Sequence, residues 1–170
     1  KIPVIYEDHN EDYHLEAAFS LEDDNSDYCL GVVAITDAVA DRLRLQGVPH
    51  KKILVQDSGV NSRAFQKYDE RAVSFRRYLL RNGRKVLVVY TGGMQVERGI
   101  ASIIDAAERA PHIQFAFAGG RSTDIDMWLE EAKKLGLNNI SFLGYLQQDE
   151  AIALQQAADI LLMPRAPGQR

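Results

Sequence analysis

The residues with the clearest capacity for chemistry lie between Val86 and Ile100, in the sequence VLVVYTGGMQVERGI. A strand-forming apolar run ends at Gly92 and Gly93, and a cation, Arg98, follows where a helix is expected to begin. A strand, a glycine turn and a helix N-terminus together direct free backbone N–H groups and the positive end of a dipole toward one place. Such a place suits phosphate or another anion, and it suggests a nucleotide ligand.

These residues also have ordinary structural explanations. Glycines that follow a strand are common in tight turns, and Arg98 could be a solvated surface residue. The helix dipole disfavours a cation in the first turn of a helix, which is a reason to expect an anion near Arg98. The segment matches neither the Walker A pattern nor the dinucleotide-binding Gly-x-Gly-x-x-Gly pattern. Local chemistry therefore leaves both explanations open.

A second glycine turn follows the next predicted strand. It consists of Gly119 and Gly120, followed by Arg121 and Ser122. In doubly wound folds, the carboxyl ends of neighbouring parallel strands form the crevice in which ligands bind. Two glycine turns at that edge strengthen the ligand hypothesis more than either turn alone.

Other candidate residues carry less information. No metal site is predicted, because the four histidines lack metal-ligand spacing; they are His9, His14, His50 and His112. His9 lies just beyond a predicted strand, where it could face a cleft or the surface. Trp128 has helical spacing with Leu129 and Ala132, which indicates core packing. No side chain can be named as a nucleophile.

The predicted elements place both glycine turns on one sheet. The second half alternates strands with amphipathic helical segments, a pattern typical of right-handed crossovers and a parallel sheet. The apolar faces of the first two segments span Ile100–Ala107 and Ile125–Ala132, and the third segment starts at Gln148 or Asp149. The strands are apolar on both faces, as in a sheet covered on both sides. The expected strands are Val86–Tyr90, Gln114–Ala118, Ile140–Leu143 and Ile160–Met163. The fold class is α/β, with Rossmann-like doubly wound parallel sheets.

The first half shows a sparser pattern of the same kind. It contains a helix from Asp37 to Gln46, a charged helical segment over residues 64–81, and three short strands: Pro3–Tyr6, Val32–Thr36 and Ile53–Gln56. Asn82 and Gly83 break the charged helix directly before the next strand. We therefore expect two domains, residues 1–82 and residues 83–170.

The composition excludes several classes of protein. The 46% hydrophobic and 26% charged fractions are ordinary for a globular chain. A net charge of -4 gives no support to nucleic acid as a partner. No apolar run approaches the roughly 20 residues needed to cross a bilayer, and the single cysteine fits a reducing compartment. We expect a cytoplasmic protein, with a peripheral association with the membrane left open.

Several segments, taken in order, resemble retaining glycosyltransferases of the GT-B fold, in the large family 4 group known as glycosyl transferases group 1. Val33–Leu43 and Lys52–Phe65 resemble the strands, short helix and connecting segment that lead into the second domain of these enzymes. Other segments resemble the opening of that domain: Tyr90–Ile100, Phe117–Gly120, Asn139–Tyr145 and Ala158–Pro164. The resemblance covers nearly the whole chain. No single motif is specific to the family, but the order and the spacing of these segments together are.

The resemblance implies transfer of a sugar from a UDP- or GDP-sugar to a glycan, lipid or small-molecule acceptor, with retention at the anomeric carbon and without a required metal or cofactor. The first 82 residues would form the end of the acceptor-side domain, and the rest would begin the donor-binding domain. Gly92, Gly93 and Arg98 would face the diphosphate of the donor, with Gly119 and Gly120 beside them. Arginine can replace the usual lysine because its fork engages phosphate.

Two further positions follow from the resemblance. Tyr145 and Leu146, after Gly144, resemble the loop whose backbone contacts the nucleobase. His9 resembles a histidine that points at the donor sugar, which makes it the candidate catalytic residue. Many family members carry an arginine where this chain has Gly93, so one phosphate contact is missing or comes from elsewhere.

The chain also departs from the family pattern at both ends. It ends at Arg170, before a Glu-x7-Glu element that binds the ribose and the sugar, and it begins after a glycine-rich loop of the first domain. We therefore expect the chain to be an internal piece that is inactive as a transferase by itself. Apolar surface and open sheet edges left exposed in such a piece would favour self-association.

Two alternatives remain. A nucleotide-sugar 2-epimerase shares the two-domain fold, although the segments Thr36–Leu43 and Val60–Phe65 favour a transferase. A non-catalytic Rossmann-like binding or scaffold module, such as a receiver-like domain, would need an acidic cluster at the strand ends. Glycines occupy those places instead.

Overall fold

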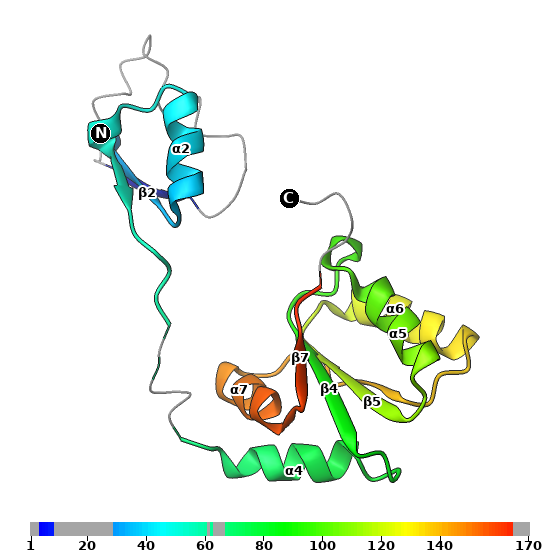
Figure 1. Cartoon of the computed structure of the whole chain (residues 1–170). Coiled ribbons are helices and arrows are strands. Elements are labelled where there is room, and N and C mark those ends of the chain that lie inside the picture. Colours follow the sequence, from blue (N-terminus) through cyan, green and yellow to red (C-terminus); the bar gives the residue numbers. More distant parts are fainter. Residues whose placement is uncertain (1–3, 9–28, 61, 63–66, 165–170) are drawn as a thin grey trace. The chain divides into compact units, whose positions relative to one another are not determined.

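The computed structural model describes residues 4–8, 29–60, 62 and 67–164 (Figure 1). The chain separates into two compact units, Lys1–Val60 and Asn61–Arg170. Each unit is an α/β structure with a parallel sheet. The α/β fold class predicted from the sequence is therefore confirmed. Within the described ranges, no helix is long and apolar enough to cross a membrane.

The described part of the first unit is a small three-stranded sheet with one packed helix. The strands β1 (Val4–Asp8), β2 (Cys29–Ala34) and β3 (Ile53–Val55) are parallel in the order β1-β2-β3. The helix α2 (Asp37–Leu45) begins at the cap residue Thr36, and the short helix η1 (His50–Lys52) leads into β3. Ala40 and Leu43 of α2 are fully buried against β2. The helix predicted from Asp37 to Gln46 is confirmed, with its end one residue earlier.

The second unit contains the four predicted strands of the second half. They are β4 (Val86–Thr91), β5 (Ile113–Ala118), β6 (Ile140–Phe142) and β7 (Ile160–Leu162), all parallel, in the order β6-β5-β4-β7. The helices are α4 (Glu70–Leu79), η2 (Val96–Arg98), α5 (Ile100–Arg109), α6 (Ser122–Lys134) and α7 (Gln148–Ala157).

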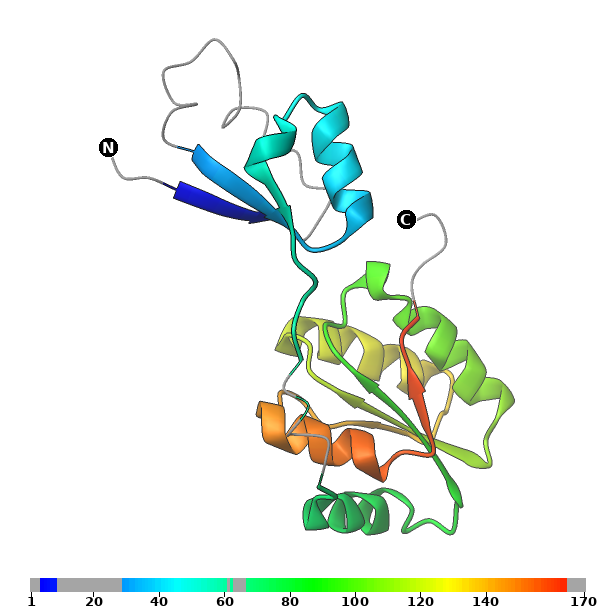
Figure 2. The same ribbon diagram turned by 60° about the vertical axis from the view of Figure 1, so that its left-hand side comes forward.

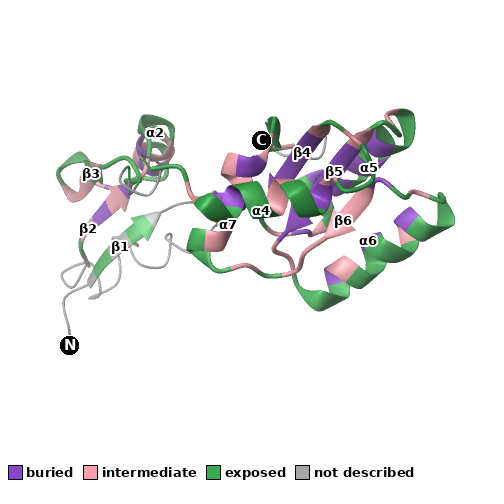
Figure 3. Cartoon of the chain, turned by 90° about the horizontal axis from the view of Figure 1, so that it is seen from below, coloured by how far each residue is buried: buried purple, intermediate pink, exposed green. Residues whose placement is uncertain are grey.

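The helices cover both faces of this sheet. Helices α5 and α6 lie on one face and α4 and α7 on the other (Figures 1 and 2). Side chains of β4 alternate between the faces: Val88 and Tyr90 pack on the α5–α6 side, and Leu87 and Val89 pack on the α4–α7 side. Burial is accordingly concentrated in β4, β5 and the inner stripes of the helices (Figure 3). The apolar character of these strands on both faces follows from this double coverage.

The division between the units differs from the one expected from the sequence. The glycine break in the sequence predicts a boundary after Asn82, whereas α4 belongs by its contacts to the second unit. Ala72 and Leu79 of α4 are buried with Leu87 and Val89 of β4. The guanidinium of Arg76 also donates to the carbonyl of Ala157 and to the carboxylate of Asp159, at 3.0 and 2.9 Å. Asn82 and Gly83 therefore form a turn inside the second unit.

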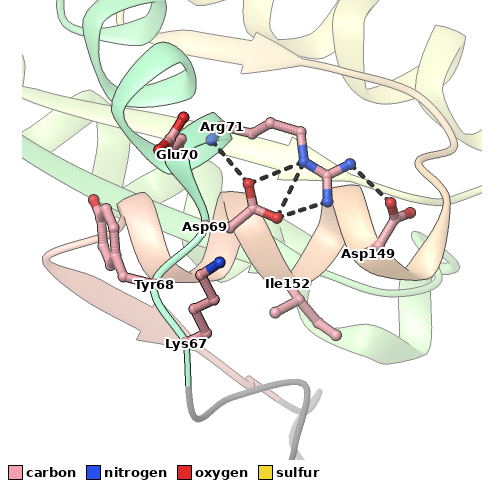
Figure 4. A pocket seen from close by; sticks show the side chains of 7 residues that line it. All are labelled: Lys67, Tyr68, Asp69, Glu70, Arg71, Asp149 and Ile152. Atoms are coloured by element: carbon pink, nitrogen blue, oxygen red, sulfur yellow. Dashed lines mark hydrogen bonds and ion pairs between the residues drawn. The ribbon is translucent and has the colours of Figure 1, made fainter.

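The start of α4 is tied to α7 by a polar network that surrounds a pocket of about 630 Å³ (Figure 4). The Arg71 guanidinium extends between two carboxylates and pairs with Asp69 at 2.6 Å and with Asp149 of α7 at 2.8 Å. The Gln156 amide accepts from the Asp69 N–H at 2.7 Å and donates to the Lys67 carbonyl at 3.0 Å. The segment that enters α4 is thereby fixed to the second unit.

This network predicts a pH dependence of stability. The side-chain hydrogen bonds from Arg71 lower the pKa of Asp69 from 3.8 to about 2 and also lower the pKa of Asp149. Because the folded-state pKa is depressed, the ionised carboxylates stabilise the fold above pH 3.8, and the Asp69 part of this stabilisation is lost as the pH falls toward 2. We expect Asp69→Asn, which keeps a good helix cap, to reduce the fall in Tm between pH 4 and pH 2.

The matched control is Asp126→Asn, which neutralises an exposed carboxylate of α6. Thermal unfolding of the three proteins, followed by circular dichroism at several pH values, measures the difference. An Asp69→Asn profile that runs parallel to the wild-type profile between pH 4 and pH 2 would contradict the role of the network.

The β7 edge of the second sheet is the surface through which we expect the self-association predicted from the sequence. Among the described strands, β7 pairs only with β4, and its residues Ile160 and Leu161 are 47% and 57% exposed. An open edge flanked by apolar side chains favours association with another chain.

We expect light scattering to show a mass that rises with protein concentration. The substitution Leu161→Lys should lower that mass, because it places a charge on the exposed edge strand. Leu45→Lys, which changes an exposed apolar side chain on the helix α2 of the first unit, is the control, and a wild-type monomer at every concentration would refute the prediction.

Candidate functional site

The candidate site lies at the carboxyl edge of the second sheet. From β4 the chain continues through α5 to β5 on one side, and the later crossover through α7 places β7 on the other side of β4. The strand order therefore reverses at β4, and the carboxyl ends of β4 and β7 flank the switch point. Open α/β sheets bind their ligands in the crevice at this position. The loop that follows β4 begins directly at the switch point.

The two glycine turns meet at this edge. The Gly92 N–H donates to the carbonyl of Ala118 at 2.9 Å, and the Gly119 N–H donates to the carbonyl of Gly144 at 2.7 Å. The loops after β4, β5 and β6 are thus connected in sequence. Gly119 has a φ of +102°, and a Cβ there would overlap the Gly92 carbonyl oxygen. The second glycine turn is therefore required for the close approach of the two backbones.

Three side chains from three elements hold the loop after β4. The Tyr90 hydroxyl donates to the Gly93 carbonyl at 2.5 Å, and the Trp128 indole N–H donates to the Met94 carbonyl at 2.7 Å. The Gln155 amide of α7 donates to the Thr91 hydroxyl at 2.7 Å. Sequence reasoning missed all three contacts. Only the position of Tyr90, beside the glycine turn, could have indicated one of them.

The position of Arg98 differs in part from the expectation. It lies in the short helix η2, and Gly99, with a φ of +74°, separates it from the first residue of α5, Ile100. Arg98 thus precedes the N-terminus of α5 instead of lying in its first turn. The cause is the left-handed conformation of Gly99, which ends η2 and caps α5 in one residue. The cation still lies beside the start of the helix.

Arg98 is exposed, and its guanidinium makes no hydrogen bond or ion pair with any residue of the described ranges. Burial raises the pKa of the Tyr90 hydroxyl, and the positive charge of Arg98 opposes this rise. The Arg98 side chain is therefore close enough to act electrostatically on the loop that Tyr90 holds.

The other arginine at this edge has a protein partner. The Arg121 guanidinium donates to both carboxylate oxygens of Asp124, at 2.9 and 3.0 Å, and Asp124 is only 9% exposed. The hydrogen bond from Arg121 lowers the pKa of Asp124, and Asp124, together with the charge of Glu97, raises the pKa of Arg121. Of the two cations, Arg121 is paired with Asp124 of α6, whereas Arg98 is available to a ligand.

The remaining predicted residues lie on the same loops or outside the described residues. Tyr145 is 75% exposed, and Leu146 is half-buried against the α4–α7 side of the core. Gly120 has a φ of +77° and packs against Met94. The structure therefore brings Gly92, Gly93, Gly119, Gly120, Arg98, Tyr145 and Leu146 to neighbouring loops of one edge. His9 lies outside the described residues.

The side chain of Gln95 lies against Gly93, the position at which the sequence resemblance expects an arginine in many family members. A Cβ on Gly93 would overlap the side-chain amide of Gln95, whose Oε1 is buried without a hydrogen-bond partner in the described ranges. Sequence reasoning gave no role to Gln95. Across the same ranges, no three His, Cys, Asp or Glu side chains are arranged to hold a metal ion.

Comparisons with known structures support the fold. The protein Alr3699/HepE of Anabaena, in complex with UDP-glucose, matches with a TM-score of 0.75 and 19% identity, over 96% of this chain and 47% of that one. A glycosyltransferase of Rickettsia africae ESF-5 matches with a TM-score of 0.70 and 18% identity, over 95% of this chain and 45% of that one. The GT-B-type fold expected from the sequence is confirmed.

Sequence comparison gives a curated relative with a related name. The chain is 27% identical over 138 residues to the alpha-galactosylglucosyldiacylglycerol synthase of Streptococcus pneumoniae (strain ATCC BAA-255 / R6), a region that is 78% of this chain and 37% of the relative. The chain thus spans less than half the length of this relative and of both structures.

The family of the chain is shown by a match to a family model over more than half of its residues. The family model described as glycosyl transferases group 1 matches residues 74–166, which include all the described loops at the carboxyl edge of the second sheet. This match covers more than half of the chain, and the chain therefore belongs to the glycosyl transferases group 1 family.

Proposed function

We propose that this chain contributes the donor-binding side of a glycosyltransferase that moves a sugar from a nucleotide-sugar to an acceptor. The observation that carries the proposal is Arg98, an exposed cation without a protein partner in the described ranges, beside the two glycine turns at the switch point. An unpaired guanidinium next to free backbone N–H groups suits a diphosphate.

The known relatives support this choice of ligand. Alr3699/HepE, which shares the fold, has been crystallised with UDP, with UDP and glucose, and with UDP-glucose. We therefore propose a UDP-sugar as the first candidate donor and a GDP-sugar as the second. The name of the Streptococcus pneumoniae relative describes a synthase of a diacylglycerol that carries sugars. A lipid is accordingly one candidate acceptor, beside a glycan or a small molecule.

The chemistry assigned to this side of the site is stabilisation of the leaving group. When the bond between the anomeric carbon and the phosphate oxygen breaks, negative charge builds on the departing nucleoside diphosphate. Arg98 and the backbone N–H groups around Gly93 would stabilise that charge, and preorganised donors of this kind supply a large part of catalysis. Retention at the anomeric carbon and membership of the family 4 group are proposed from the sequence resemblance.

The other predicted residues receive matching roles. The loop that carries Tyr145 and Leu146 would contact the nucleobase, as the family resemblance implies; this loop follows β6 and is connected to Gly119 through the carbonyl of Gly144. His9 remains a proposed catalytic residue at the end of the acceptor-side domain. Of the two predicted domains, the region 83–170 is proposed to bind the donor, and a cytoplasmic location is proposed for the protein.

Calorimetric titration of the chain with UDP, GDP and ADP tests the proposal. We expect one of the three nucleotides to bind, and we expect Arg98→Ala to weaken its affinity about tenfold to a hundredfold, the usual range for loss of a hydrogen bond from a charged donor. Arg109→Ala is the matched control, since Arg109 is an exposed arginine in the last turn of α5. Its affinity should equal that of the wild type.

The outcomes separate the remaining possibilities. No binding of any nucleotide would remove the donor-site proposal and favour a scaffold role. Equal effects of Arg98→Ala and Arg109→Ala would show that Arg98 has no specific contact with the ligand. With a UDP-sugar as the added substrate, formation of the epimerised nucleotide-sugar would favour the epimerase over the transferase.

A further inference from the structure

Trp128 packs in the core and also makes a hydrogen bond to the loop that follows β4. It is the sole tryptophan of the chain, it is 7% exposed, and it packs with the cluster between the sheet and the helices α5 and α6. Its indole N–H also donates to the carbonyl of Met94, 34 residues earlier in the chain, at 2.7 Å. We propose that Trp128 is a positioning residue for the loop Gly92–Gln95, an assignment that rests on the proposed function of this loop in binding a diphosphate.

The geometry of the peptide group explains how Trp128 acts. A peptide unit is planar, and in its trans form the carbonyl and the following N–H point in opposite directions. The indole fixes the Met94 carbonyl toward α6, so the N–H of Gln95 points away from α6. That N–H has no acceptor in the described part of the chain. Trp128 therefore keeps one free backbone donor in a fixed direction.

The contacts of Tyr90 and Gln155 with the same loop do not orient a backbone donor of an exposed residue. Tyr90 fixes the carbonyl of Gly93, whose peptide partner is the N–H of the fully buried Met94. Gln155 holds the side chain of Thr91 rather than a peptide group of the turn. Of the three side chains that hold the loop, Trp128 is thus the one that orients a donor belonging to a partly exposed residue, Gln95.

A loop held in this way binds with less loss of conformational freedom. Fixing the backbone and side chains of a binding loop costs free energy when it occurs on binding, and a loop that is already fixed avoids that cost. Loss of the indole N–H should therefore weaken nucleotide binding even though Trp128 does not itself contact the ligand. The packing of the ring should contribute to stability separately.

The experiment replaces Trp128 by β-(3-benzothienyl)alanine, an isostere in which sulfur replaces the N–H group. A second variant, Trp128→Phe, removes both the N–H and part of the packing. We expect both to weaken the affinity of the chain for the nucleotide that binds the wild type, by about three- to tenfold, the effect of one ordinary hydrogen bond. The isostere should lower Tm less than Trp128→Phe does.

A matched control separates positioning from general loosening of the core. Phe115→Leu removes aromatic packing from the same buried cluster at a position that pairs with Val88, in the middle of β4, before the loop begins. It should lower Tm while leaving the nucleotide affinity within twofold of the wild-type value. A loss of affinity in Phe115→Leu as large as in the isosteric variant would overturn the proposal.

Nuclear magnetic resonance of the unliganded chain provides a test that does not depend on a nucleotide. The indole N–H of the sole tryptophan gives one resolved signal, and we expect it to exchange slowly with solvent. In the isosteric variant, the backbone amide signals of Gly93–Val96 should shift and exchange faster, while those of β4 stay unchanged. Unchanged loop amides would refute the positioning role, whereas failure of the wild type to bind any nucleotide would refute only the proposed function.

Discussion

The parallel pairing of β4 with both β5 and β7 is the constraint on which the site depends. Parallel neighbours require crossovers that return the chain to the same end of the sheet, so every loop after a strand meets at one edge. The chain passes from β4 to β5 on one side, and the crossover from β6 through α7 places β7 on the other side of β4, which creates the switch point beside Gly92. Coverage of both faces by helices buries the central strands β4 and β5, while the loops at the carboxyl edge keep exposed residues such as Gly92, Arg98 and Tyr145.

The arginines of the second unit differ in whether the fold pairs them with carboxylates. Arg71, Arg76 and Arg121 of the second unit are each paired with carboxylates, and these pairs fix α4 and the start of α6. Arg98 has no such pair in the described ranges. A cation that the fold does not use for its own stability is the group most easily given to an anionic ligand, and its place beside the α5 N-terminus adds the helix dipole to its field.

The sequence by itself indicated the strands, most helices and both glycine turns, because these depend on local properties. A run of apolar residues, a helical period and a glycine after a strand are each contained within a few neighbouring positions. The candidate residues at the carboxyl edge could be named for the same reason, since all follow predicted strands. The resemblance to glycosyltransferases rested on the order of these local segments.

Tertiary structure alone decided the contacts between segments far apart in the chain. The boundary between the units lies before α4 because this helix packs on the second unit, where Arg76 donates to Ala157 and Asp159, 81 and 83 residues away. Trp128 looked like a packing residue because its helical spacing says nothing about a carbonyl 34 residues earlier. Whether Arg98 or Arg121 is free likewise depends on which carboxylate the folded chain brings near each guanidinium. Periodicity records which face of an element is buried, but only the packed elements determine what each polar group on that face meets.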